Sequence, residues 1–325
     1  MRICTFRRDH EDHLSPGLVL DDAVVDLTRV ALSFESTQRD GAGRIGSEAG
    51  IPQLVSAEAL ELLHQIHEVA VQGEAAEFDG QPLKNFPLEA TQLGPPVPKP
   101  AKIVAAGRNY AAHTEEAKII WEERGVTPKP PTYPTGFFKM PSAVIGPYDD
   151  VPYPETNEMD YEVELAAVIG EYALNVDPET ALRYVAGYTV MNDVSARDIQ
   201  FSEMENVGIV VGKNFEGFAP MGPWFVTTEE ISDPQSLTIE LSVNGENRQD
   251  SSTSKMTFSV AECVSYFSKM GLRPGDMVMT GSPEGIATVK RPDPGPFYLK
   301  PGDVVEAEIG GIGSIRNRII STEVR

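Results

Sequence analysis

Cysteine is scarce in this sequence, and long apolar runs are missing. The only two cysteines, Cys4 and Cys263, stand too far apart for the paired spacing of a metal or redox motif, so we expect a protein of the reduced cytoplasm. No run approaches the roughly 18 apolar residues of a membrane-spanning helix. The N-terminus also lacks the apolar core of a secretory signal peptide. We therefore expect no membrane association.

Basic residues are also few. Lys and Arg number 27 against 49 Asp and Glu, which gives a formal net charge of −22, and they do not gather in basic stretches. Such a surface repels phosphate backbones and anionic lipid headgroups, so we expect no nucleic-acid partner. The acidity itself is explained most simply by solubility.

Histidine is rare, and His113 is the only one of the five that lies beyond residue 100. It lies in a helical pattern that begins at Ala111, and Glu116, three residues later, shares its helix face. A carboxylate beside an imidazole raises its basicity and fixes its tautomer, as a water-activating general base requires. The alternative is a surface histidine beside a helix glutamate, and the pattern alone leaves both open.

Carboxylates, in contrast, concentrate at two points. Residues 160–165 read as one strand with its carboxylates on one face and its apolar side chains on the other. Those carboxylates are Asp160, Glu162 and Glu164, and Asp193 follows a second apolar strand. Neighbouring carboxylates repel one another unless a cation lies between them. Glu162, Glu164 and Asp193 therefore predict a site for Mg²⁺ or Mn²⁺ rather than Zn²⁺; the alternative is a half-exposed strand with a solvated acidic face.

Two lysines and one late turn are further candidates. Lys139 and Lys213 each lie in an apolar stretch, where a lysine either has a functional role or extends its head to water while its stem packs. Ser282 lies in a tight Gly-Ser-Pro loop that follows a short strand ending at Thr280. Such loops are as typical of plain turns as of substrate-binding sites.

The character of the chain changes near residue 98. Residues 1–98 combine short strand patterns with one helix, capped by Ser56, and so predict a small N-terminal α+β domain. A stiff, proline-rich linker follows, and a buried-strand pattern begins at Ile103. We therefore expect two units, an accessory domain of residues 1–98 and a catalytic domain of residues 99–325.

Five motifs, in this order, resemble the fumarylacetoacetate hydrolase family over roughly residues 101–325. They lie at residues 107–113 (Gly-Arg-Asn-Tyr-Ala-Ala-His), 160–165 (Asp-Tyr-Glu-Val-Glu-Leu), 192–200 (Asn-Asp-Val-Ser-Ala-Arg-Asp-Ile-Gln), 212–215 (Gly-Lys-Asn-Phe) and 274–283, from Pro-Gly-Asp to Thr-Gly-Ser-Pro. The resemblance implies a mixed α+β, β-rich catalytic domain of rolled mixed sheets, a homodimer, and Mg²⁺ or Mn²⁺ in the site.

The resemblance also implies roles for individual residues. Three of them become metal ligands: Glu162, Glu164 and Asp193. His113 and Glu116 become the water-activating pair. The groups that offset oxyanion charge are Arg197, Gln200 and Lys213, and those on the substrate side are Lys139, Thr280 and Ser282.

The activity that the resemblance implies is metal-dependent hydrolysis of a carbon–carbon bond in a 1,3-dicarbonyl acid, such as an acylpyruvate or fumarylpyruvate. Water activated by His113 and Glu116 would attack the distal carbonyl, and an enolate supported by the metal would leave. The alternative within the family is isomerisation or decarboxylation of a 2-hydroxymuconate-like or oxaloacetate-like acid in aromatic catabolism. A non-catalytic acid-binding protein is disfavoured because binding alone needs no base.

Overall fold

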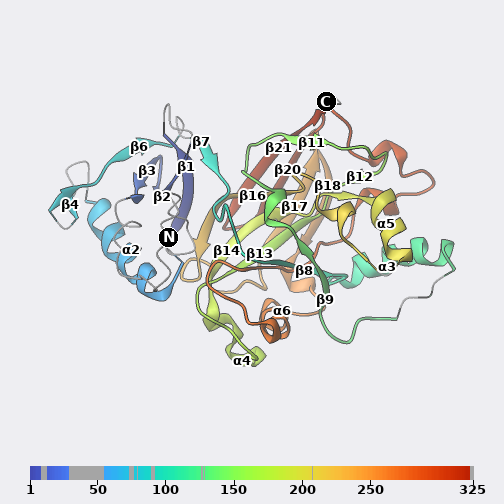
Figure 1. The fold of residues 1–325 in the computed structure, drawn as a ribbon, viewed down its shortest axis with the longest axis horizontal. Helices are drawn as coiled ribbons and strands as arrows, with labels where there is room; N and C mark the ends of the chain where they lie inside the picture. The colour runs from blue at the N-terminus through green and yellow to red at the C-terminus, as the bar shows by residue number, and fades with distance from the viewer. Residues whose placement is uncertain are drawn as a thin grey trace.

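The computed structural model describes residues 1–8, 13–28, 55–72, 77–78, 80–88, 92–125, 127, 129–206 and 208–322. Within these ranges the chain forms the strand-rich, mixed α+β fold that the sequence predicts (Figure 1). A smaller lobe holds the N-terminal strands and one long helix. A larger lobe holds the remaining sheets, with helices at its periphery.

A mixed, twelve-stranded sheet runs through both lobes. Its strands are β1 (Arg2–Arg7), β2 (Leu14–Leu20), β3 (Ala23–Asp26), β6 (Asn85–Pro87), β7 (Gln92–Gly94), β8 (Ile103–Gly107), β9 (Thr135–Lys139), β10 (Val144–Ile145), β13 (Val163–Ile169), β14 (Val185–Asn192), β16 (Ala219–Thr227) and β19 (Met277–Met279). The main path has the order β6-β3-β2-β1-β16-β14-β13-β19-β8-β9, while β10 pairs with β16 and β7 with β1. Strands β13 and β14 are buried along their whole length, so they form the centre of the larger lobe.

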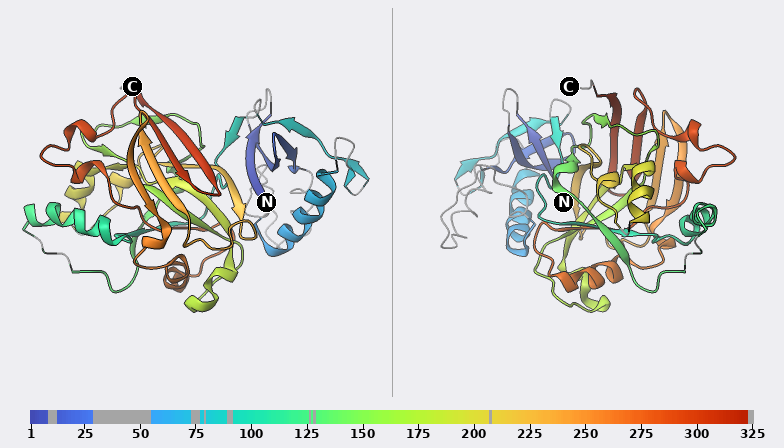
Figure 2. Two further views of the ribbon diagram at one scale, coloured as in Figure 1. Left: turned by 180° about the vertical axis from the view of Figure 1, so that it is seen from behind. Right: turned by 45° about the vertical axis from the view of Figure 1, so that its right-hand side comes forward.

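A five-stranded sheet lies against this large sheet (Figure 2). Its strands, in spatial order, are β11 (Val151–Tyr153), β21 (Gly313–Ser321), β20 (Val304–Ile309), β17 (Thr238–Val243) and β18 (Glu246–Ser252). Strand β20 shows why the two sheets pack: Val305, Ala307 and Ile309 are buried, whereas Glu306 and Glu308 are exposed. This alternation places one apolar face of the strand on the core.

Two short pairs of strands complete the sheet structure. They are β4 (Glu77–Phe78) with β5 (Gln81–Pro82), and β12 (Met159–Asp160) with β15 (Ser195–Ala196). The α-helices are α2 (Ala57–Ala70), α3 (Ala111–Glu123), α4 (Pro178–Ala181), α5 (Arg197–Glu205) and α6 (Val260–Phe267). As predicted, the Ser56 side chain caps α2 by accepting a hydrogen bond from the Ala59 N–H. Among the described helices, none has the length and apolarity that crossing a membrane requires.

The N-terminal strands join the large sheet directly. Strand β1 pairs antiparallel with β16, with Arg2 opposite Val226 and Ile3 opposite Phe225. Ile3 is fully buried in the same apolar cluster as Val163 of the larger lobe. The sheet therefore crosses the predicted boundary near residue 98, and the division into two independently folding units stays a prediction.

The continuous strand predicted for residues 160–165 is wrong. Strand β12 ends at Asp160 and β13 begins only at Val163. Between them, side chains replace the sheet partners of the backbone: the Tyr161 N–H donates to the Asp160 carboxylate (2.9 Å) and the Glu162 N–H donates to the side chain of Asn192 (2.9 Å). The predicted acidic face is also buried, since Glu162 is 6 % exposed and Asp160 is fully covered. The alternative of a solvated face is thereby excluded.

Candidate metal centre and active site

Three carboxylates converge where β13 begins and β14 ends. Strands β13 and β14 pair antiparallel with Val163 opposite Asn192, and the Asp193 N–H donates to the Glu162 carbonyl (2.8 Å). This register brings Glu162, Glu164 and Asp193 together, and one carboxylate oxygen from each lies within 4.8 Å of the others. All three are buried. Grouped carboxylates without water are costly unless positive charge compensates them.

Cationic side chains compensate two of the three. Lys213 Nζ lies 2.6 Å from oxygens of both Glu162 and Asp193. Lys139 Nζ lies 2.8 Å from the other Asp193 oxygen, and Arg197 Nη2 lies 2.8 Å from Glu162. Burial alone would raise the pKa of Glu162, but Arg197 and Lys213 outweigh it and hold that pKa well below its usual range. Glu162 is thus held as an anion, and both oxygens of Asp193 lie in ion pairs with lysines.

Glu164 is the uncompensated member. In the described ranges it forms no ion pair; its contact is a hydrogen bond from the Gly281 N–H (2.8 Å), which the left-handed backbone of Gly281 (φ +90°) allows. Burial, followed by the charges of Asp193 and Glu162, raises the pKa of Glu164 well above its usual range. A buried set of oxygen donors in which one carboxylate lacks a counter-charge fits a hard divalent cation such as Mg²⁺ or Mn²⁺.

His113 lies on α3 and is buried, with 8 % of its surface exposed. Burial, more than its neighbours, lowers the pKa of His113, so its imidazole is neutral near pH 7. Its Nδ1 has no hydrogen-bond partner among the described residues. Glu116 shares the α3 face as predicted, but its carboxylate accepts from the Gly285 N–H (2.9 Å) rather than from the imidazole. The function of the two as a pair therefore stays a prediction.

Asp160 holds Arg197 in place, a role that the sequence did not indicate. Its carboxylate accepts from Arg197 Nε (2.9 Å) and from the N–H groups of Ala287 (2.8 Å) and Thr288 (3.1 Å). Arg197 in turn donates to the Gln200 side chain (3.0 Å). Asp160 and Gln200 therefore fix the Arg197 guanidinium. Asp160 is itself held by backbone N–H groups that lie more than a hundred positions later in the chain.

Gln249 of β18 was also missed. Its amide donates to the Ser282 hydroxyl (2.8 Å) and to the Pro283 carbonyl (2.9 Å), and its oxygen accepts from the Val163 N–H (3.0 Å). It thus ties the Ser282 loop to the start of β13. No local sequence motif indicates that a glutamine in a strand links two distant segments in this way.

A cavity of about 410 Å³ opens over the carboxylates. Among the predicted site residues, Glu116, Lys139 and Thr280 do not line it. The Thr280 hydroxyl donates to the Leu165 carbonyl (2.9 Å), and Lys139 is buried and paired with Asp193. The predicted residues that do line it are His113, Glu162, Glu164, Asp193, Arg197, Gln200, Lys213 and Ser282. The rest of the lining is largely apolar, with contributions from α3, α5 and β9.

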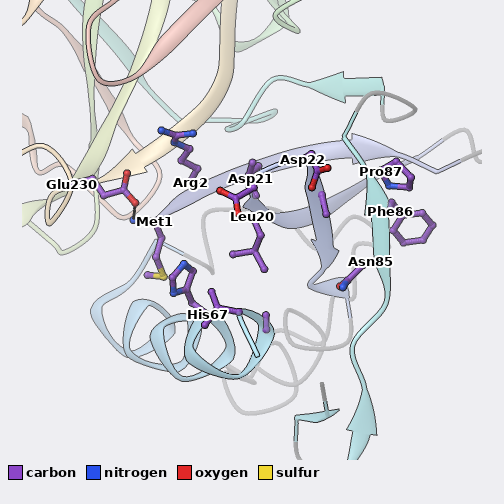
Figure 3. Close-up of a pocket in the computed structure, with 14 residues that line it drawn as sticks. Met1, Arg2, Leu20, Asp21, Asp22, His67, Asn85, Phe86, Pro87 and Glu230 are labelled. Carbon is purple, nitrogen blue, oxygen red and sulfur yellow. Dashed lines mark ion pairs between the residues drawn. The ribbon is translucent and has the colours of Figure 1, made fainter. Parts of the chain in front are cut away.

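A second, larger cavity of about 710 Å³ lies in the N-terminal lobe, between α2 and strands β1 to β3 (Figure 3). Charged groups of both signs line it, including Arg2, Asp21 and Glu230, and Glu230 is already paired with the amino group of Met1 (2.8 Å). It shares no lining residue with the smaller cavity. The one group of potential metal ligands found among the described residues lies elsewhere, so we place the active site in the smaller cavity.

Comparison with known proteins gives consistent results. Residues 102–320 match the family model described as "Fumarylacetoacetate (FAA) hydrolase C-terminal". The fumarylacetoacetate hydrolase domain-containing protein 2 homolog of Dictyostelium discoideum is 41 % identical over 246 residues, which cover 73 % of this chain and 76 % of that protein. The mitochondrial oxaloacetate tautomerase FAHD2A of Bos taurus is 40 % identical over 234 residues, 71 % of this chain and 70 % of that protein.

A solved structure resembles the whole chain. It is maleylpyruvate hydrolase from Sphingobium sp. SYK-6 in complex with manganese(II) ion and pyruvate. The TM-score is 0.75 at 27 % identity, and the match covers 99 % of this chain and 100 % of that one.

Proposed function

The chain belongs to the fumarylacetoacetate hydrolase family, and from this premise we propose that it catalyses keto–enol proton transfer in a 2-oxo dicarboxylic acid. Oxaloacetate is the first candidate substrate. Glu162, Glu164 and Asp193 are the residues that would hold the required Mg²⁺ or Mn²⁺. When bound, such a cation polarises the 2-oxo group and acidifies the adjacent carbon.

The observation that carries this proposal is a neutral, unpaired imidazole in the same cavity as the carboxylate cluster. His113 presents a buried Nδ1 without a hydrogen-bond partner in the described part of the chain, and its lowered pKa keeps it free to accept a proton. Proton abstraction beside a carbonyl needs a base of this kind close to the polarised group. The named relative from Bos taurus, an oxaloacetate tautomerase, supports the same reaction class.

Three donors supply the electrostatic support. Arg197, Gln200 and Lys213 line the cavity and can offset the negative charge that develops on the substrate oxygen as the proton leaves carbon. Their positions are fixed before the substrate arrives, because Asp160 holds Arg197 and Glu162 holds Lys213. The apolar remainder of the lining limits water, which strengthens these interactions.

Carbon–carbon bond hydrolysis of an acylpyruvate or fumarylpyruvate, the activity expected from the sequence, is the second candidate. The likeness to a maleylpyruvate hydrolase over nearly the whole chain favours it. It requires His113, with Glu116, to activate a water rather than to accept a proton from carbon. The two reactions share the site and differ in the step that the imidazole performs.

A substrate panel tests the proposal. We expect the protein to accelerate the interconversion of enol and keto oxaloacetate, followed by ultraviolet absorbance, with Mn²⁺ or Mg²⁺ but not with EDTA. His113→Ala should lose this acceleration, whereas His64→Ala, on the half-exposed face of α2, should keep it. Rapid cleavage of an acylpyruvate without tautomerase activity would replace the first candidate with the second.

Several broader expectations stand as parts of the proposal. We expect small 2-oxo or dicarbonyl acids and a second copy of the chain as partners. The cytoplasmic location and the place in aromatic catabolism stay predictions, and the bovine relative is named as mitochondrial. Fractionation of the native cells, followed by immunodetection, would establish the location.

A further inference from the structure

Arg108 differs from the other cations of the catalytic cavity. Arg197 is paired with Asp160 and Glu162, and Lys213 with Glu162 and Asp193. Arg108 lines the same cavity, yet its guanidinium has no hydrogen bond or ion pair with any residue that the structure describes. Of the arginines and lysines that line the cavity, Arg108 is thus the one whose charge no described carboxylate pairs.

The backbone holds Arg108 in an unusual and fixed conformation. Its φ of +56° lies in the left-handed region of backbone conformation, which residues other than glycine rarely adopt. Its carbonyl accepts from the Thr114 hydroxyl (3.2 Å), and the next side chain, Asn109, donates to the carbonyls of Phe258 and Thr280 (2.8 Å each). Both sides of the turn between β8 and α3 are thus anchored, so Arg108 is presented to the cavity by a rigid segment.

From these observations we infer that Arg108 binds the distal carboxylate of the substrate. The inference rests on the proposed function and names its substrate class: 2-oxo dicarboxylates rather than 2-oxo monocarboxylates. The carboxylate beside the 2-oxo group belongs at the cation-binding end of the cavity. The second carboxylate of the substrate would then bind Arg108, because no carboxylate of the described residues is paired with its guanidinium.

The chemistry of the surroundings favours an anion at this position. A guanidinium offers a planar pair of N–H donors that matches both oxygens of a carboxylate. Ile120, Trp121 and Phe137 line the same cavity, and apolar walls strengthen a charge-assisted hydrogen bond relative to water. Oxaloacetate and a fumarylpyruvate-like acid both carry two carboxylates, so the inference holds for either candidate reaction.

A matched pair of acids tests the inference by binding rather than by turnover. 2-Oxoglutarate and 2-oxopentanoate have the same chain length and differ only in a terminal carboxylate or methyl group, and neither loses CO₂ as a β-keto acid does. Titration calorimetry with the Mn²⁺-loaded protein gives both affinities. We expect the parent protein to prefer the dicarboxylate.

The variants are Arg108→Met, Arg108→Lys and, as a control, Lys118→Met, which removes one exposed positive charge from α3. Arg108→Met should weaken 2-oxoglutarate binding about 10- to 100-fold, the range for losing a charged hydrogen-bond partner, and change 2-oxopentanoate binding less than about twofold. Arg108→Lys keeps the charge without the paired donors and should lie between parent and Arg108→Met. Lys118→Met should bind both acids as the parent does.

The outcomes separate this inference from the proposed function. If Arg108→Met weakens the binding of both acids equally, or of neither, Arg108 does not bind the distal carboxylate. The inference is then overturned, while the proposed function stands. If the Mn²⁺-loaded parent binds neither acid, or binds both equally, the inference is overturned, and the oxaloacetate assay decides the proposed function separately. Thermal unfolding of each variant confirms that the comparison is made on folded protein.

Discussion

Glu162 and Glu164 stand two positions apart on the chain, yet their surroundings differ in charge. Glu162 is paired with Arg197 and Lys213, whereas Glu164 faces Asp193 and Glu162 and, among the described residues, receives a single backbone N–H. The same substitution should therefore have opposite effects on the metal-free protein.

We expect Glu164→Gln to raise the melting temperature without metal, because the amide removes a crowded negative charge and its oxygen still accepts from Gly281. Glu162→Gln should lower it, since breaking a buried ion pair from one side typically costs about 3–5 kcal/mol. Both should lose Mn²⁺ affinity. Differential scanning fluorimetry in EDTA and calorimetric titration with Mn²⁺ measure these effects; equal shifts of the two melting temperatures would contradict the charge difference.

The pH dependence of the reaction reports on His113. Burial depresses its folded-state pKa, so the neutral base persists below the ordinary histidine value of about 6.5 and is lost only as the pH falls through the depressed pKa. We expect kcat/KM to fall on the acidic side, with its midpoint below pH 6.5. His113→Ala should reduce the rate about 10²- to 10⁴-fold and abolish that limb. A midpoint at or above 6.5 in the parent protein would count against a buried, neutral base.

Residue type and spacing were sufficient to predict the carboxylate cluster and to single out His113, which lines the same cavity, while its catalytic role stays a prediction. Glu162 and Glu164 stand two positions apart, and His113 is the only histidine beyond residue 100, so few combinations were possible. Asp160, Gln249 and Arg108 could not be assigned in this way. Their roles depend on partners that are distant in sequence, or on a backbone angle, and neither leaves a local pattern.

At the scale of elements, a short 3₁₀ helix, η4 (Val211–Lys213), carries Lys213 into the site. It is held to α5 by Glu203, whose carboxylate accepts from the N–H groups of Val210 (3.0 Å), Val211 (2.7 Å) and Gly212 (3.0 Å). These backbone hydrogen bonds oppose desolvation and lower the pKa of Glu203. The Glu203 carboxylate thus fixes the segment that carries Lys213 into the cavity.

Glu203→Gln replaces one accepting oxygen by a donor and should loosen η4. We expect faster hydrogen exchange at Val211 and Gly212 and a lower kcat, with the melting temperature nearly unchanged. Glu205→Gln is the matched control, because Glu205 contacts the exposed Arg124 instead. Because the folded-state pKa of Glu203 is depressed, the anchor holds above the ordinary glutamate pKa and is lost as the pH falls through the depressed value. Identical exchange in both variants would remove the anchoring role.

The break between β12 and β13 shows what periodicity does not reveal. Alternation of charged and apolar residues from 160 to 165 favours a strand, and it does place the carboxylates together. The backbone at Tyr161 and Glu162 nevertheless bonds to the side chains of Asp160 and Asn192. Hydrogen bonds from the backbone to nearby side chains compete with sheet pairing. The two-residue alternation of charged and apolar residues does not show whether the backbone pairs with a strand or with a side chain.

At the scale of the whole molecule, β9 forms one edge of the large sheet. Exposed apolar side chains lie on it and beside it: Phe138 is 47 % exposed, Met140 48 % and Val210 58 %. The three line one shallow groove of about 570 Å³. An apolar groove beside a sheet edge is a typical place for a second chain, so we propose it as the contact surface of the predicted homodimer.

We expect the purified protein to elute with twice the chain mass of 35.4 kDa when size exclusion is combined with light scattering. Phe138→Glu should shift it towards the monomer, because the introduced charge would be buried at the contact. Tyr148→Glu, which alters an exposed aromatic that does not line the groove, is the control. A parent protein that stays monomeric at micromolar concentration would rule out this surface as a dimer contact.

The pairing of β1 with β16 also sets the order in which the protein can be completed on the ribosome. Met1 hydrogen bonds to Thr227, 226 positions later. At a synthesis rate of about 5–20 residues per second, β1 waits on the order of ten to forty seconds for its partner strand to emerge. During that interval Arg2 and Ile3 lack the sheet neighbour that β16 later provides, whereas the Thr5 end of β1 can already pair with β7. Slower elongation lengthens this interval, so we expect the yield of folded protein to fall when translation is slowed.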